Sequence, residues 1–330
     1  MRAGLVTLLV LITAPLRADD GAASIAAGGI VMMKREPRIV MAKEVLQISA
    51  KRVIVCYDFR NDSDEDITTE VAFPIPDYHL SMEDNKPSQQ GFDDFRLWVD
   101  GAPTRYQVEA RAFLKNAEYT ELLRGMHVDV ASFGHATSNV ESPDVRKLTG
   151  NQRQQLAGTA LIDREDDSPL WTVKKKYHWQ QAFPAHQTVH IRHEYSPVLG
   201  SENSVAYGLG SKPDPAMAKE IASFCLDKRL LDTLSEIANS KDRWASYSYV
   251  DFILTTANTW KTPIEDFTLI VERPHWKNNR GEPDLADYVS FCWDGPITKV
   301  DADHFSAHTV NLVPAKELRV GFFGVEHGRP

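Results

Sequence analysis

The chain has 330 residues, of which 42% are hydrophobic and 25% are charged, and its formal net charge is −9. This composition is that of an ordinary globular protein. The acidic balance argues against nucleic-acid binding, which needs a basic surface to neutralise phosphates. Length alone suggests about two domains.

The first eighteen residues have the layout of a secretory signal peptide. Arg2 supplies the positive charge, residues 5–14 form an apolar run, and the small residue Ala18 precedes an acidic pair. A run of about 10 residues is too short to span a bilayer, which takes about 20. We therefore predict export after cleavage near residue 18, with a mature net charge of −11. The expected location is the periplasm, with full secretion left open.

Strand patterns dominate the first third of the mature chain. Residues 39–48, 51–59 and 67–73 are rich in the β-branched and aromatic side chains that are typical of strands. Further on, Asp100-Gly101 is a strong signal for a type I′ turn between alternating segments, so we predict a hairpin there.

The hydrophobic period changes near residue 113, and we predict a helical insertion over about 113–168. Residues 171–181 and 188–195 then alternate again and predict a second hairpin. Asp214-Pro215 has the form of an N-cap followed by an N1 proline, which starts a helical region. This region extends to Ala238 and is broken near Asp227, a candidate cap for another helix. Strand patterns return from residue 249 onward.

Strands joined by turns, with the helices grouped together, argue against alternating α/β topology. We predict a mainly β protein of the antiparallel β-sandwich type, α+β overall. The expected domains are a β-sandwich over residues 19–205, which contains the helical insertion, and a helix-plus-β domain over 206–330.

The chain has three cysteines, and export would place them in an oxidising compartment. Cys56 lies in a segment that we expect to be buried on both faces, so an inert thiol is predicted there. We predict a disulfide between Cys225, at a helix junction, and Cys292, in a late strand.

None of the sequence motifs for nucleotide, zinc or nucleophile sites is complete. The chain has no GxxxxGK[ST], no HExxH, no GxSxG and no CxxC. We therefore predict no catalytic residue, no cofactor and no metal.

The two faces of the predicted second hairpin differ. Trp171, Val173, Tyr177 and Trp179 lie on one face, which we expect to be core. The opposite face carries charged residues, with Lys176 expected opposite Glu194. Two interpretations remain open, a solvated face with cross-strand charge pairs or a face that binds an anion or a partner. The candidate binding face consists of Lys174, Lys176, His178, His190, Arg192 and Glu194.

Seven stretches together resemble an exported bacterial family known as domain-of-unknown-function family 4424. The resemblance spans most of the mature chain and implies export, but no activity and no catalytic residue. Residues 39–112 are also similar to β-sandwiches of the vault/inter-alpha-trypsin type, which favours an interaction module. The seven stretches are residues 26–30, 59–63, 71–76, 179–184, 193–200, 256–260 with 263–264, and 290–292.

These observations predict an exported periplasmic protein that binds a partner in the cell envelope, either a protein or a glycan, without catalysis. The alternative is a periplasmic hydrolase that acts on glycans through two carboxyl groups. Such a site needs the carboxyl groups about 5–9.5 Å apart. With 46 acidic residues, the sequence does not locate such a pair.

Overall fold

The computed structural model describes residues 21–26, 30–79, 94–131, 147–165, 167–197, 199–202, 204–277, 283–285 and 288–327. The predicted signal peptide lies outside these residues. Among the helices described, none is long and apolar enough to cross a membrane.

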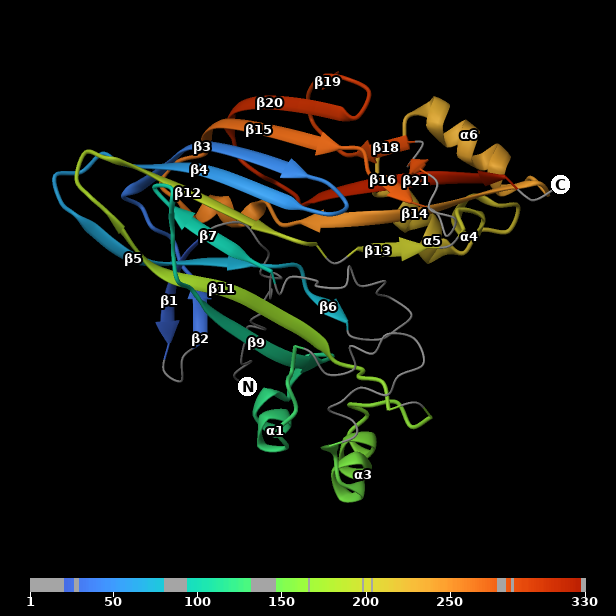
Figure 1. Cartoon of the computed structure of the whole chain (residues 1–330), viewed down its shortest axis with the longest axis horizontal. Helices are drawn as coiled ribbons and strands as arrows, with labels where there is room; N and C mark the ends of the chain where they lie inside the picture. Colours follow the sequence, from blue (N-terminus) through green and yellow to red (C-terminus); the bar gives the residue numbers. More distant parts are fainter. Residues whose placement is uncertain are drawn as a thin grey trace, which may run out of the picture.

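Two large sheets face each other as the layers of a sandwich (Figure 1). The lower sheet in that view has the order β10-β9-β11-β5-β1-β2, with β6 also paired to β11. Its strands are β1 (Gly21–Ala26), β2 (Ile30–Met33), β5 (Ile67–Pro74), β6 (Tyr78–His79), β9 (Gln107–Leu114), β10 (Ala117–Glu118) and β11 (Thr172–Phe183).

The upper sheet has the order β19-β20-β15-β3-β4-β12-β7-β8. Its pairs are antiparallel except for β15 with β3, which is parallel. Its strands are β3 (Ile39–Ile48), β4 (Val53–Asn61), β7 (Arg96–Val99), β8 (Ala102–Pro103), β12 (Thr188–Tyr195), β15 (Ile264–Glu272), β19 (Ile297–Lys299) and β20 (His304–Leu312).

A third sheet, at the right of Figure 1, has the order β13-β14-β21-β18 and lies beside the helices α4 to α6. Its strands are β13 (Gly200–Glu202), β14 (Arg243–Phe252), β18 (Tyr288–Phe291) and β21 (Leu318–His327). The strands β16 (His275–Lys277) and β17 (Pro283–Leu285) form a separate pair. The helices are α1 (Thr120–Gly125), α3 (Gly150–Gly158), α4 (Ala206–Leu209), α5 (Pro215–Ala222), α6 (Lys228–Ala238) and the 3₁₀ helix η1 (Thr255–Thr259).

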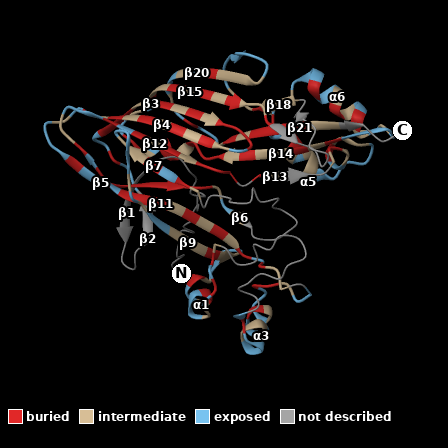
Figure 2. Cartoon of the chain, viewed as in Figure 1, coloured by how far each residue is buried: buried red, intermediate tan, exposed pale blue. Residues whose placement is uncertain are grey.

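The predicted fold class, a mainly β antiparallel sandwich with helices, is confirmed. Buried and less buried residues alternate along the strands, as expected when one face of each sheet packs on the core (Figure 2). The main core fills the space between the layers. It includes Phe59 of β4, Phe73 of β5, Phe183 of β11 and Phe267 of β15.

Local signals for turns and caps are confirmed. Asp100 and Gly101 form the two-residue turn between β7 and β8, with positive φ angles of 48° and 77°, as a type I′ turn requires. The predicted hairpin is otherwise wrong, because its alternating return segment at Tyr106, Val108 and Ala110 leads into β9 of the lower sheet, and only the short β8 pairs back on β7. The Asp214 side chain accepts hydrogen bonds from the first turn of α5, and Asp227 caps α6 in the same way. The helical insertion contains α1 and α3, although residues 132–146 and 166 lie outside the described part of the chain.

The predicted second hairpin is wrong. β11 pairs with β5, β6 and β9 in the lower sheet, whereas β12 pairs with β4 and β7 in the upper sheet. The turn between them therefore carries the chain from one layer to the other instead of closing a ladder. A strand needs the same polar–apolar alternation in either arrangement, so the sequence pattern did not separate them.

The expectation that residues 51–59 are buried on both faces is also wrong. β4 buries only alternate side chains, and Cys56 lies half-buried on the outer face, directly opposite Arg192. Burial raises the pKa of the Cys56 thiol despite this neighbouring cation. Because the thiolate is the reactive form, the raised pKa agrees with the predicted inert thiol.

The boundary predicted between residues 205 and 206 falls between β13 and α4. Strands from its two sides share the upper sheet, in which β15 pairs with β3. The main core also contains residues from both sides, although α5 and α6 pack in a smaller core on β14 and β21. The two-domain division stays a prediction.

Asp94 links the start of β7 to the end of β12. It accepts hydrogen bonds from Ser196 N at 2.7 Å and Ser196 Oγ at 2.9 Å, and it pairs with Arg52. Burial of Asp94 favours the neutral carboxyl, but the bonds from Ser196 and Arg52 outweigh it and hold the pKa of Asp94 below its usual value.

We expect Asp94→Asn to lower the free energy of unfolding at pH 7 by about 1–2 kcal/mol, because charge-assisted hydrogen bonds are lost. A depressed folded pKa contributes stability above the unfolded pKa, and this is lost as pH falls through the folded value. The difference in the free energy of unfolding between wild type and variant should therefore disappear as the pH falls below about 4. Urea unfolding at pH 7 and pH 3 measures this difference. A difference that stays constant with pH would contradict a stabilising role of the ionised Asp94 carboxylate.

Candidate functional site

A cleft of about 560 Å³ lies where the lower sheet, the third sheet and the helices meet. One wall comes from the chain just after β5, one from the end of β14, and one from the start of β21. The residues that follow α5 and β18 complete it. The lining residues are Pro76, Asp77, Ser223, Asp251, Phe252, Ile253, Cys292, Lys316, Glu317 and Arg319.

The register of β14 and β21 places two opposite charges side by side. Asp251 lies directly across from Arg319, and Tyr249 lies across from Gly321. A Cβ at Gly321 would lie 2.7 Å from Cδ1 of Phe224, so the glycine gives the Phe224 ring room to lie close against the sheet. Phe224 in turn forms part of the surroundings of Arg319.

Arg319 is held from several directions. Its Nε and Nη2 donate to the two carboxylate oxygens of Asp251 at 2.6 and 2.8 Å. Its guanidinium carbon lies 4.5 Å from the centre of the Tyr249 ring. Burial opposes the charge, but Asp251 holds the pKa of Arg319 above its usual range. Nη1 makes a weaker contact, 3.5 Å from Ser223 Oγ. It is therefore the guanidinium nitrogen that can donate a hydrogen bond to a ligand.

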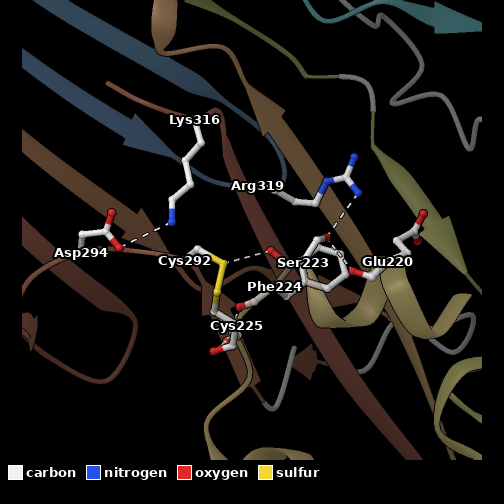
Figure 3. Close-up of a disulfide and its surroundings, with 9 residues drawn as sticks. Glu220, Ser223, Phe224, Cys225, Cys292, Asp294, Lys316 and Arg319 are labelled. Carbon is white, nitrogen blue, oxygen red and sulfur yellow. Dashed lines mark hydrogen bonds and ion pairs between the residues drawn. A yellow bond between two sulfur atoms is a disulfide. The ribbon is translucent and has the colours of Figure 1, made fainter. Parts of the chain in front are cut away.

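The predicted disulfide is confirmed, and it forms part of the cleft wall. Cys225 and Cys292 are bridged, with their Cα atoms 5.0 Å apart. Figure 3 shows the bridge between the residues that follow α5 and the end of β18, with Ser223 and Phe224 beside it. Ser290 adds a second link, because its hydroxyl donates to the carbonyl of Phe224 at 2.9 Å. The bridge therefore ties the helical region to the sheet at the site.

The carboxylates of the cleft are engaged in structural contacts. Asp251 is paired with Arg319, as above. Glu317 accepts from the backbone N–H of Leu254 at 2.8 Å and from Thr255 Oγ1 at 2.7 Å, and so anchors η1. Asp77 lies 3.0 Å from the ammonium of Lys174, from β11. Among the described residues, no three His, Cys, Asp or Glu side chains are grouped so as to hold a metal ion.

The candidate binding face predicted from the sequence is divided between the two sheets. Lys174, Lys176 and His178 lie on β11, and His190, Arg192 and Glu194 lie on β12, so Lys176 does not lie opposite Glu194. Of the six, Lys174 is the one tied to the cleft, through Asp77.

The remaining members of that face have other partners. His178 is buried and lies 2.5 Å from Glu70, and Lys176 lies 4.0 Å from Glu109. On the other sheet, His190 lies 2.6 Å from Asp58. Arg192 binds Glu194 at 2.6 Å within its own strand and stacks on Trp98, with its guanidinium carbon 4.7 Å from the ring centre. The opposite face is core as predicted, since Trp171, Val173, Tyr177 and Trp179 are buried.

A family model described as a domain of unknown function, DUF4424, matches residues 18–320. The chain belongs to this family. The match confirms the resemblance found in the sequence and covers all of the cleft. A crystal structure of a candidate nutrient binding protein from Legionella pneumophila is 15% identical in sequence. That match covers 87% of this chain and 68% of that chain, with a TM-score of 0.42. No curated protein matches the sequence.

Sequence reasoning missed the main residues of this DUF4424 cleft. Asp251 and Arg319 are 68 positions apart and belong to no motif. The one local signal is that each is a charged residue at an end of a strand pattern, Asp251 before an apolar stretch and Arg319 at the start of one. That signal occurs at many strand ends, so it does not identify a site.

Proposed function

We propose that this DUF4424 protein is an exported binding protein of the cell envelope without catalytic activity, and that the cleft beside the disulfide binds its ligand. The observation that carries the proposal is the guanidinium of Arg319, which Asp251, Tyr249 and Phe224 hold in place at the cleft. A preorganised cation loses little freedom when it binds an anionic group. The ligand is therefore a small molecule or peptide with an anionic group.

Export is supported by the predicted signal sequence and by the disulfide, which is typical of oxidising compartments. Fractionation of cells that express the full chain tests it. We expect protein in the periplasmic fraction with an N-terminus near residue 19, as measured by mass spectrometry. An intact N-terminus in the cytosolic fraction would contradict this part of the proposal.

Arg319→Lys tests the site, because lysine keeps the charge but loses the planar fork. We expect thermal-shift screening of the mature protein with anionic metabolites and peptides to find ligands. The variant should bind them about tenfold or more weakly, since a charge-assisted hydrogen bond contributes about 1.5–3 kcal/mol. Arg124→Lys is the matched control, because Arg124 is an exposed, ion-paired arginine on α1.

Unchanged affinity in Arg319→Lys would place the ligand elsewhere. Turnover of a glycan by the purified protein would favour the alternative, a hydrolase with paired carboxyl groups.

A further inference from the structure

A second, smaller pocket adjoins the cleft. Its volume is about 100 Å³, and it shares Cys292, Lys316 and Glu317 with the cleft. The rest of its lining is largely apolar and comes from the end of β20, the chain that leads into β21, the two residues after Cys292, and the residue before η1. These further lining residues are Leu254, Trp293, Asp294, Thr309, Leu312, Val313, Pro314, Ala315 and Leu318.

The pocket has firm walls. Leu254 and Leu318 are buried and belong to the main core. The Trp293 ring stacks on Phe267, with 5.4 Å between the ring centres. A cavity of about 150 Å³ holds benzene. A pocket of about 100 Å³ is smaller than that, so it suits a short branched aliphatic group better than an aromatic ring or a long acyl chain.

Lys316 lies at the boundary between the pocket and the cleft. Its ammonium is 3.5 Å from Asp294, and the two side chains are 57% and 88% exposed. An ion pair this exposed contributes little to stability, so the ammonium can turn toward another anion. Figure 3 shows Lys316 and Arg319 above the disulfide in that view, with Lys316 paired to Asp294 and Arg319 bonded to Ser223.

We propose that the pocket and the cleft together bind the C-terminal end of a short peptide whose last residue has a branched aliphatic side chain. The aliphatic side chain enters the small pocket, and the terminal carboxylate lies in the adjoining cleft, where Lys316 and Nη1 of Arg319 bind it. The preceding residues lie in the larger cleft, which at about 560 Å³ exceeds the size of a single amino acid. This inference rests on the proposed function and names the ligand class of the same cleft.

Titration calorimetry of the purified mature protein with the peptide Ala-Ala-Leu tests the proposal. The amide of this peptide should bind about tenfold or more weakly, because it lacks the carboxylate. Ala-Ala-Gly should also bind about tenfold or more weakly, because burial of a leucine side chain contributes about 1.5–3 kcal/mol. Ala-Ala-Phe should bind more weakly than Ala-Ala-Leu, because the pocket suits a branched aliphatic group better than a ring.

Two variants assign these effects to the structure. Lys316→Ala should reduce the difference between the peptide acid and its amide. The control Lys228→Ala, an exposed lysine paired with Asp232 on α6, should leave that difference unchanged. Ala315→Trp fills the pocket from an exposed position, and it should remove the preference for leucine over glycine. Thermal unfolding of each variant confirms that it is folded.

The outcomes of these binding experiments distinguish a failure of the peptide proposal from a failure of the proposed function. Equal affinity for acid and amide, or for leucine and glycine ends, would overturn the peptide-end assignment. Equal affinity for free leucine and Ala-Ala-Leu would show that the residues before the last one contribute nothing, and it would overturn a peptide as the ligand. If Ala-Ala-Leu does not bind but other anionic ligands bind in an Arg319-dependent way, this inference fails and the proposed function stands. If no anionic ligand binds, both fail.

Discussion

Replacement of Cys225 and Cys292 by alanine is expected to lower the free energy of unfolding by about 4 kcal/mol. The bridge joins residues 67 positions apart, and in the chain-entropy model a cross-link over that length strongly restricts the unfolded chain. Denaturant unfolding of the mature protein measures the difference. Cys56→Ala is the matched control, because Cys56 is the free thiol of the three cysteines.

The same double variant should also weaken ligand binding. Ser223 and Phe224 directly precede Cys225, and both contact Arg319. Without the bridge, this segment keeps the hydrogen bonds of Ser290 and the packing of Phe224, but it loses its covalent link to the end of β18. Dithiothreitol should shift the wild type toward the variant and leave the variant unchanged. An equal response of both proteins would mean that the bridge does not form in the exported protein.

Trp260→Ala is expected to cost about 3–5 kcal/mol, the range for removal of a buried aromatic side chain. Trp260 follows η1 and is 1% exposed. Its ring centre lies 4.6 Å from that of Phe59 in the upper sheet and 6.1 Å from that of Phe183 in the lower sheet. The control Trp244→Ala, at a position 42% exposed, should change stability by about 0.5 kcal/mol or less.

This variant also tests the division near residue 205. Trp260 belongs to the predicted second domain but packs on residues of the predicted first domain. If the chain unfolds as one unit, Trp260→Ala should shift a single transition that is the same by fluorescence and by circular dichroism. Two separate unfolding transitions would support two independent domains if Trp260→Ala shifts the midpoint of one and leaves the other as in the wild type.

Features that depend on a few neighbouring residues were predictable. The turn at Asp100-Gly101 is determined locally, because both residues must adopt positive φ angles. The caps at Asp214 and Asp227 are local as well, since each carboxylate binds N–H groups within the next three residues. The main β content follows in the same way from the alternation of side chains.

The assignment of strands to sheets was not predictable from such signals. β11 and β12 follow each other in the chain and alternate in polarity, as the strands of a hairpin would. Their separation into two layers depends on which distant strands pair with them. The parallel pairing of β15 with β3 joins residues more than 200 positions apart, and no local pattern specifies it.

By itself, the sequence determined the strand and helix content, the local turns and caps, the disulfide pair and the family, and it predicts export. Each of these depends on near neighbours, on redox chemistry or on similarity along the chain. The proposed binding site was decided only by the tertiary structure. Its charged residues come from three separate segments, and each has an unremarkable local sequence; they are Asp77, Asp251, Lys316, Glu317 and Arg319. They meet because long-range pairing and core packing bring the ends of β5, β14 and β21 together.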